Sequence, residues 1–181
     1  MDPVPLWTIG HSTRTFEDFL ALLQSAGIEA LADVRRFPGS RRLPHFGQDA
    51  LSAALAHAGI VYEHFAELGG RRQARKDSPN TAWRDPAFRG YADYMMTGEF
   101  RAGIARLLDL AREKRTAFMC AEALWWQCHR GLIADHLKAA GHLVLHILGP
   151  GKIDPHPFTS AASIVNGALS YASAEGDLFA R

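Results

Sequence analysis

Three features are scarce in this sequence: cysteine, an excess of charge of one sign, and long apolar runs. Two cysteines in 181 residues are too few for a disulfide framework, so we expect reduced thiols. A formal net charge of +1 argues against a strongly basic DNA binder, because non-specific binding scales with the phosphates that a protein neutralises. No apolar run approaches the roughly 18 residues of a membrane span, and residues 1–6 lack the basic-then-apolar pattern of a signal peptide. We therefore expect a cytoplasmic protein without a membrane partner.

Apolar runs alternate with amphipathic segments along most of the chain. Strands are expected at residues 4–9, 29–34, 60–64, 115–119 and 142–148. Helices are expected at residues 16–26, 48–58, 86–113 (with a break or bend at Gly98 or Gly103), about 129–141, and 160–171. This alternation predicts a three-layer α/β fold, with a mostly parallel five-stranded sheet and helices on both faces. We expect a single domain over residues 1–181, with a core at about 4–148 and a tail, 149–181, that packs on it.

The chemically capable side chains gather at one end of the predicted strands. His11 and Ser12 follow the first strand, an arginine-rich turn follows the second, and a segment with two cysteines follows the fourth. The turns at the opposite ends carry mainly glycine. Because ligands of open α/β sheets bind beyond the carboxyl ends of the strands, we expect these separate turns to form one pocket.

Several ordered motifs in these turns resemble a known family. The motifs are Thr8-Ile9-Gly10-His11-Ser12, Asp33-Val34-Arg35, Pro38-Gly39-Ser40-Arg41, Leu68-Gly69-Gly70, Cys120-Ala121-Glu122 and Cys128-His129-Arg130. Together they resemble the bacterial family catalogued as domain of unknown function 488, over about residues 7–148. The name of that family assigns no activity, so the resemblance implies that the motifs form one site and implies no reaction.

A looser resemblance is to rhodanese-like domains. In those domains an Asp-Val-Arg follows an early strand, and a catalytic cysteine follows a later strand just before a helix. Asp33-Val34-Arg35 and Cys120 look similar here. A rhodanese loop is short, whereas a longer segment with two tryptophans separates Cys120 from Arg130. The resemblance therefore implies a similar architecture and does not extend to sulfur transfer.

Cysteine chemistry is the first candidate activity. A helix that begins near His129 offers unpaired backbone N–H groups and the positive end of its dipole, which together favour an anion. Cys128 lies at that terminus, where Arg130 would also lower the thiol pKa and favour the thiolate. Cys120 lies at the end of the fourth predicted strand. The alternative for both cysteines is a role as small buried apolar side chains.

Proton transfer requires groups that titrate near neutral pH or that carry a carboxylate. His11 and His129 could act as an acid, a base or a metal ligand, or could be buried histidines with satisfied hydrogen bonds. Glu122 could act as an acid or a base, or could form an ion pair with Arg35 or Arg130. The candidate catalytic residues are thus Cys120, Glu122, Cys128, His129 and His11.

Arginines are the candidate ligands for an anion, since guanidinium groups bind phosphate and carboxylate well. We expect Asp33 to pair with one arginine of the turn that follows it. A second basic stretch at residues 71–76 could close over an anion or remain a solvated loop. The candidate substrate-binding residues are Ser12, Arg35, Arg41, Arg71, Arg130 and Trp125, the last through stacking.

Three functions remain open from the sequence. The first is an enzyme for a small anionic substrate that bears a phosphate or carboxylate, as a nucleotide does. The second is a module that binds single-stranded nucleic acid through two basic loops and tryptophan. The third is a metalloenzyme with zinc or iron, although adjacent Cys128 and His129 are not expected to point inward together. The sequence requires no cofactor, assigns no metal ligands and leaves the oligomeric state undefined.

Overall fold

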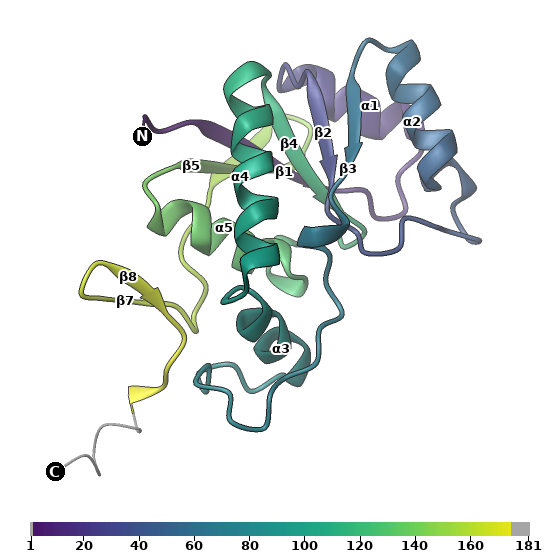
Figure 1. Cartoon of the computed structure of the whole chain (residues 1–181). Coiled ribbons are helices and arrows are strands. Elements are labelled where there is room, and N and C mark those ends of the chain that lie inside the picture. The colour runs from purple at the N-terminus through teal and green to yellow at the C-terminus, as the bar shows by residue number, and fades with distance from the viewer. Residues whose placement is uncertain (1, 175–181) are drawn as a thin grey trace, which may run out of the picture.

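Helices and strands alternate in the computed structural model of the chain, which describes residues 2–174 (Figure 1). The strands are β1 (Pro5–Gly10), β2 (Ala30–Asp33), β3 (Val61–His64), β4 (Thr116–Cys120), β5 (Leu143–Gly149), β6 (Lys152–Pro155), β7 (Ser163–Val165) and β8 (Ala168–Ser170). The helices are α1 (Phe16–Ser25), α2 (Gln48–His57), α3 (Pro86–Tyr94), α4 (Gly98–Glu113) and α5 (Arg130–Ala139).

The main sheet contains β3, β2, β4, β1, β5 and β6, in that order. The first five of these strands run parallel, and β6 pairs antiparallel with β5. The predicted α/β fold with a mostly parallel sheet is confirmed, and the sheet has one strand more than expected. The extra strand, β6, is a short edge strand whose residues are all exposed, so it lacks the apolar pattern that marks the others.

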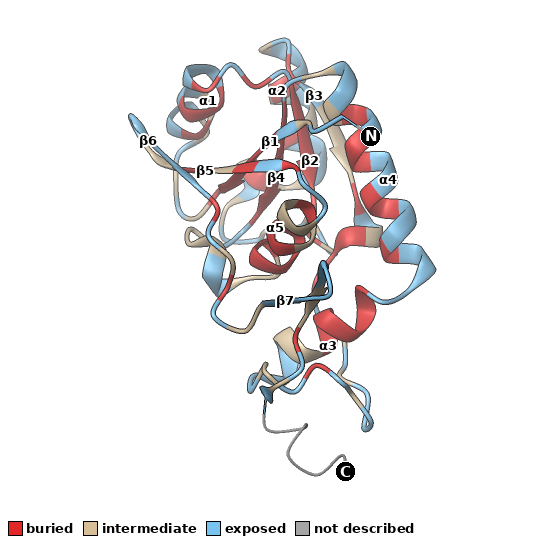
Figure 2. Ribbon diagram, turned by 90° about the vertical axis from the view of Figure 1, so that its left-hand side faces the viewer, coloured by how far each residue is buried: buried red, intermediate tan, exposed pale blue. Residues whose placement is uncertain are grey.

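The sheet is covered on both faces, and the buried residues of the helices face it (Figure 2). Trp7 and Ile9 of β1 pack in one apolar cluster with α1 and α2. Leu6 of the same strand belongs to a second cluster, which contains residues of α3, α4 and α5. Consecutive side chains of a strand point to opposite faces, which is why one strand serves both clusters. The carboxyl ends of the parallel strands are therefore held between two packed layers.

The stretch expected as one helix from residue 86 toward 113 consists of two helices. Gly98, one of the two glycines expected to break it, is the first residue of α4, whereas Gly103 lies inside α4. Thr97 separates the two helices. Its hydroxyl donates to the carbonyl of Tyr94 at the end of α3, and it accepts the N–H of Phe100 in α4. One side chain therefore closes the first helix and caps the second.

The tail contains a hairpin where a helix was expected at residues 160–171, so that prediction is wrong. β7 and β8 pair antiparallel, and the turn that joins them consists of Asn166 and Gly167, whose φ angles are 50° and 79°. An Asn-Gly pair favours a two-residue turn with positive φ at both positions, so the signal was present in the sequence. The tail also contacts α5, because Thr159 and Tyr171 donate hydrogen bonds to the buried Asp135.

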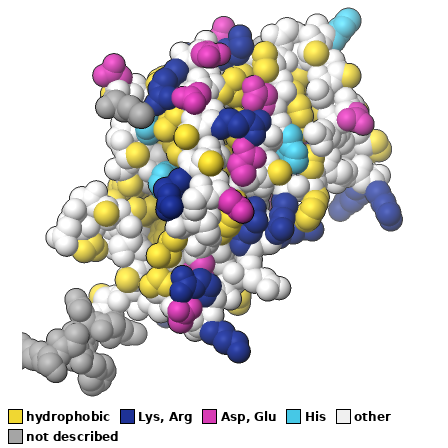
Figure 3. All heavy atoms as spheres, viewed as in Figure 1, with side chains coloured by type: hydrophobic (Ala, Val, Ile, Leu, Met, Phe, Trp, Pro, Cys, Tyr) yellow, Lys and Arg dark blue, Asp and Glu magenta, His cyan; other side chains and the backbone are white. Residues whose placement is uncertain are grey.

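The face of the molecule that carries α4 mixes side chains of both charges (Figure 3). Arg106 of α4, for example, pairs with Glu63 and Glu67. Interspersed charges of this kind do not build the extended positive field that attracts a nucleic-acid backbone. None of the helices within residues 2–174 is long and apolar enough to cross a membrane.

Candidate active site

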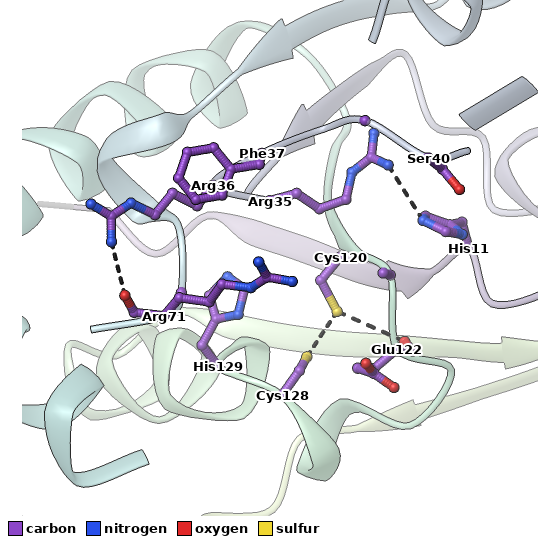
Figure 4. Close-up of a pocket in the computed structure, with 13 residues that line it drawn as sticks. His11, Arg35, Arg36, Phe37, Ser40, Arg71, Cys120, Glu122, Cys128 and His129 are labelled. Atoms are coloured by element: carbon purple, nitrogen blue, oxygen red, sulfur yellow. Dashed lines mark hydrogen bonds between the residues drawn. The ribbon is translucent and has the colours of Figure 1, made fainter. Parts of the chain in front are cut away.

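A pocket of about 280 Å³ opens at the carboxyl ends of the central strands (Figure 4). His11 directly follows β1, Arg35 lies just beyond β2, and Cys120 ends β4; all three line the pocket. Arg71, from the segment after β3, and Cys128, just before α5, complete its walls. Turns that are far apart in the chain meet here because the parallel strands end at one edge of the sheet.

Most of the candidate residues line this pocket, namely His11, Arg35, Arg71, Cys120, Glu122, Cys128 and His129. The other four lie elsewhere. The N–H of Ser12 donates to the carbonyl of Ala121, and Arg41 is exposed on the neighbouring turn. Trp125 stacks on His146 with ring centroids 4.6 Å apart, and Arg130 is buried. The pocket is also lined by residues that the sequence did not single out as ligands, namely Arg36, Phe37, Gly39, Ser40, Gly70 and Ala121.

The two cysteines face each other, with their Sγ atoms 2.8 Å apart (Figure 4). Cys120 is only 2% exposed, whereas Cys128 is half-buried. The backbone N–H of Arg130, at the start of α5, donates to Sγ of Cys128 at 3.4 Å. A reagent that enters the pocket therefore meets Cys128 first, and the helix terminus favours a negative charge on that sulfur.

Arg130 supplies a positive charge beside the cysteine pair. It is 1% exposed, and its guanidinium donates to Thr8 Oγ1 at 3.2 Å and to the backbone carbonyl of Glu122 at 2.8 Å. Within residues 2–174 its Nε has no hydrogen-bond partner, and none of its hydrogen bonds goes to a carboxylate. The ion pair between Glu122 and Arg130, one of the alternatives expected from the sequence, is therefore not formed among the described residues. Because an uncompensated buried cation is costly, the cysteine sulfurs are its natural counter-charge.

These surroundings separate the pKa values of the two thiols. Burial alone would raise the pKa of Cys128, but the hydrogen bond from Cys120 and the charge of Arg130 lower it to about 5. Burial raises the pKa of Cys120 well above its ordinary value, and the neighbouring Cys128 raises it further. Burial alone would lower the pKa of Arg130, but the two cysteines raise it. At neutral pH, Cys128 is therefore the thiolate, and Cys120 is the thiol that donates to it.

His129 is a neutral histidine with one nitrogen free to accept a proton. Its Nε2 donates to the carbonyl of Val34 at 2.8 Å, so Nδ1 carries the lone pair. Gly70 allows this ring to sit close to the turn before Arg71, since a Cβ at Gly70 would lie 2.9 Å from Nδ1. Burial lowers the pKa of His129. Both His129 and its neighbour Cys128 line the pocket, contrary to the expectation that they would not point inward together.

His11 is neutral as well, but both of its nitrogens are engaged. Its Nδ1 donates to the carbonyl of Ser12 at 2.8 Å, and its Nε2 lies 3.4 Å from Nη1 of Arg35. Its ring stacks on Phe46 at 4.3 Å. Burial, together with the charge of Arg35, lowers the pKa of His11 to about 4. His11 therefore shapes the wall of the pocket, as expected of a buried histidine with satisfied hydrogen bonds.

Arg35 lines the pocket, but its charge is balanced inside the protein. Its Nε and Nη2 donate to the carboxylate of Asp33 at 2.9 and 2.6 Å, which confirms the predicted pairing of Asp33. Its Nη1 donates to the carbonyl of Phe46, and Tyr62 donates to Asp33 from the other side. This buried group fixes the turn after β2 and leaves little free positive charge for a ligand.

Arg71 is the arginine that remains available to a ligand. Its side chain points into the pocket on the side of the cysteines, and it makes no hydrogen bond or ion pair within residues 2–174 (Figure 4). Its backbone is held in the left-handed region, at φ 58°, where Nη1 of Arg36 donates to its carbonyl at 2.8 Å. A residue other than glycine rarely adopts this backbone conformation, because it is strained. Strained residues of this kind are concentrated at functional sites.

The other two arginines of the second basic stretch make their contacts elsewhere. The guanidinium of Arg72 lies 3.7 Å above the ring of Tyr94, and Arg75 pairs with Asp77. The carboxylate of Asp93 accepts the backbone N–H of Arg75 and so ties the loop to α3. Of this stretch, Arg71 is therefore the residue that reaches the pocket.

A buried row of hydrogen bonds continues from Arg130 to the far side of α5. Arg130 donates to Thr8, Thr8 lies 2.6 Å from His146, His146 lies 2.8 Å from His156, and His156 lies 2.9 Å from Asp135. A guanidinium only donates and a carboxylate only accepts. The row therefore runs from a donor at Arg130 to an acceptor at Asp135. This row was not predicted from the sequence, although His146 within an apolar strand was a signal for it.

Replacing Gly10 by alanine is expected to displace the loop that carries Glu122. A Cβ atom at Gly10 would lie 1.7 Å from the carbonyl oxygen of Glu122, so the backbone would have to move. We expect the free energy of unfolding to fall by about 1–3 kcal/mol, as for other overpacked sites, in chemical denaturation. Gly39→Ala is the matched control, because a Cβ there meets no atom within 4 Å. Equal stability of the two variants would contradict the close approach at Gly10.

The fold and the pocket together define a class: an α/β domain with two thiols and an arginine side chain that line a pocket at the carboxyl edge of its sheet. Among the described residues, no group of three or more His, Cys, Asp or Glu side chains could hold a metal ion. The family model described as "Domain of unknown function DUF488" matches residues 15–137, and the chain belongs to this family. Searches of curated proteins and of solved structures give no significant match. His146 and His156 lie outside the matched residues.

Proposed function

We propose that this protein is an enzyme of the bacterial cytoplasm that uses a cysteine thiolate on a small anionic substrate. The substrate carries a phosphate or a carboxylate, as a nucleotide does, and binds at the carboxyl edge of the sheet. Cys128 is the nucleophile, Cys120 donates a hydrogen bond to it, and Arg71 holds the anion. His129, through Nδ1, and the Glu122 carboxylate are the groups that can accept a proton.

The observation that carries this proposal is the buried Arg130, which has no carboxylate partner among residues 2–174. An apolar side chain would fill the same space at lower cost, so a purely structural role explains the cation poorly. Perturbed charges of this kind cluster at functional sites. The anion that Arg130 can stabilise is a cysteine thiolate, and Cys128 is the cysteine that opens toward the pocket.

Further features support the same assignment. Reduced thiols persist in the cytoplasm, which is why we place the enzyme there. The reactive groups line a pocket and not an open surface, which favours an enzyme over a module that binds single-stranded nucleic acid.

Alkylation by a neutral and a charged reagent tests this proposal. Iodoacetamide and iodoacetate attack the same sulfur, but iodoacetate carries a carboxylate. We expect Cys128 to react with a pH midpoint near 5, because the thiolate is the nucleophile. Relative to a free thiol such as glutathione, we expect the rate ratio of iodoacetate to iodoacetamide to rise about tenfold, since one charged hydrogen bond contributes about 1.5 kcal/mol or more. Mass spectrometry locates the label.

Variants separate the two halves of the proposal. Arg71→Ala should return the rate ratio to that of the free thiol and leave the pH midpoint unchanged. Arg75→Ala is the matched control, because Arg75 lies in the same loop and pairs with Asp77. A midpoint near 9 for both cysteines, or labelling only after denaturation, would contradict the thiolate. A rate ratio that is insensitive to Arg71 would contradict the anion site.

A further inference from the structure

We propose that the pocket is a dithiol reductant of small anionic disulfides, in which Cys128 attacks the substrate and Cys120 resolves the product. This inference rests on the proposed function, because it takes the Cys128 thiolate as the nucleophile. It adds the class of substrate and a chemical role for the second cysteine.

The geometry of the pair is the main evidence. Sγ of Cys120 and Sγ of Cys128 are 2.8 Å apart, and a disulfide bond is about 2.05 Å long, so closure shortens the separation by only about 0.8 Å. The backbone on each side is fixed. The carbonyl of Cys120 accepts the N–H of His11 at 3.0 Å, and the carbonyl of Cys128 accepts the N–H of Gly131 at 3.2 Å. These are the two cysteines of the whole chain, so any internal disulfide must join them.

Burial sets the order of events. Cys120 is 2% exposed, whereas Cys128 lines the pocket and is half-buried. A disulfide from solution can therefore reach Cys128, and the mixed disulfide that forms there lies next to Cys120. A resolving thiol needs this arrangement, because it must be protected from the external reagent and must touch the first sulfur.

Arg130 can assist both steps. Before the reaction it stabilises the thiolate of Cys128, and the hydrogen bond and charge of Cys128 help to raise the pKa of the buried Cys120. Once Cys128 is part of a mixed disulfide, that hydrogen bond and that negative charge are gone. The charge of Arg130, which lowers the pKa of Cys120, then acts on this second thiol. The same guanidinium therefore stabilises first the thiolate of Cys128, which attacks the substrate, and then the thiolate of Cys120, which resolves the mixed disulfide.

The electron balance is that of two thiol–disulfide exchanges. In the first, the Cys128 thiolate forms a bond to one sulfur of the substrate R–S–S–R, and the substrate bond breaks to release R–S⁻. In the second, Cys120 loses its proton to the released thiolate and attacks Sγ of Cys128, which expels a second R–S⁻. The protein loses two electrons and becomes the Cys120–Cys128 disulfide, and the substrate disulfide is reduced to one thiol and one thiolate.

Arg71 favours substrates with negative charge. Its guanidinium, which has no hydrogen-bond or ion-pair partner in the described part of the chain, points into the pocket on the side of the cysteines (Figure 4). A carboxylate on either half of the disulfide can bind there and bring the S–S bond to Cys128. A neutral disulfide of similar reactivity lacks this contact, which makes the charge of the substrate a direct test of its class.

The test uses dithiobis(nitrobenzoate), a disulfide with a carboxylate on each half, and the folded full-length protein. The wild type should release two equivalents of thionitrobenzoate rapidly, and its mass should fall by two hydrogens with no adduct. Cys120→Ser should release one equivalent and keep one thionitrobenzoate on Cys128, and Cys120→Ala should do the same if serine disturbs the buried site. The ratio of the rate with dithiobis(nitrobenzoate) to the rate with neutral dithiodipyridine should fall about tenfold in Arg71→Ala.

The outcomes distinguish this inference from the proposed function. A wild-type protein that reacts rapidly but keeps a stable adduct on Cys128 would overturn the resolving role of Cys120 and leave the thiolate nucleophile standing. A protein whose Cys128 reacts with neither reagent until it is denatured would overturn the proposed function itself. Circular dichroism of each variant shows that the comparison is made between folded proteins.

Discussion

Replacing Arg130 by methionine is expected to move the pH midpoint of Cys128 alkylation upward, from about 5 toward the ordinary thiol value of 9. The reason is that Arg130 supplies the positive charge next to the sulfur, while burial on its own favours the neutral thiol. The rate at a single pH is a poor readout, because a thiolate of higher pKa is also intrinsically more nucleophilic. The midpoint, measured with iodoacetamide across the pH range, reports the charge of the sulfur directly.

The same substitution should change how stability depends on pH. The pKa of Cys128 is lower in the folded chain than in the unfolded chain, so its ionisation stabilises the fold above pH 9, and this contribution is lost as the pH falls through about 5. Arg130→Met lacks the contribution. The stability difference between wild type and variant should therefore widen from pH 5 to pH 9 in urea denaturation.

Two further variants control this experiment. Arg130→Lys keeps a positive charge and should keep the midpoint well below 9. Arg14→Met removes a guanidinium that donates to the carbonyls of Gly10 and Leu148, so it should lower stability without moving the midpoint. An Arg130→Met protein that is folded and still titrates near pH 5 would show that another group holds the thiolate.

Replacing Asp135 by asparagine should destabilise the protein strongly. The carboxylate of Asp135 accepts four hydrogen bonds, from Nε2 of His156, from the N–H and the hydroxyl of Thr159, and from the hydroxyl of Tyr171. An asparagine would place an amide donor against some of these donors. Loss of a buried network of this kind costs about 3 kcal/mol or more, which for a chain of this length lowers Tm by about 6–12 °C in differential scanning calorimetry.

The effect should be local as well as global. Because Asp135 holds three residues of the tail, its amide variant should lose protection from hydrogen exchange first in the segment around Thr159 and Tyr171. Asp154→Asn is the matched control, since Asp154 lies exposed on β6. Equal Tm values for Asp135→Asn and Asp154→Asn would contradict the importance of the buried row.

The position of the pocket could be predicted from the sequence because it depends on topology alone. Once strands and helices alternate, parallel strands must end at one edge, and the residues after each strand must meet there. His11, Arg35 and Cys120 are brought together in that way. The pairing of Asp33 with Arg35 was also predictable, since the two residues lie two positions apart in one turn.

The buried row could not be predicted, because it depends on how distant segments align. Thr8 and His146 are partners in the register of β1 and β5, and nothing near either residue in the chain specifies that register. His156 and Asp135 meet only because the tail folds back on α5. The position of Arg130 was unpredictable for the same reason: it lies buried beside the pocket, and its guanidinium donates to Thr8, a residue more than a hundred positions away.

The central place of β1 has a consequence for how the molecule is made. Its two neighbours in the sheet are β4 and β5, and Trp7 pairs with Ala117 of β4 on one side and with Leu145 of β5 on the other. During synthesis, β1 therefore cannot form its native strand pairs until β4 and β5 have been made. Cys120 and Cys128 are also synthesised late, and Arg130 cannot reach Thr8 until the sheet is complete. The lowered pKa of the Cys128 thiol depends on this packing, so we expect both thiols of an unfolded nascent chain to keep ordinary pKa values.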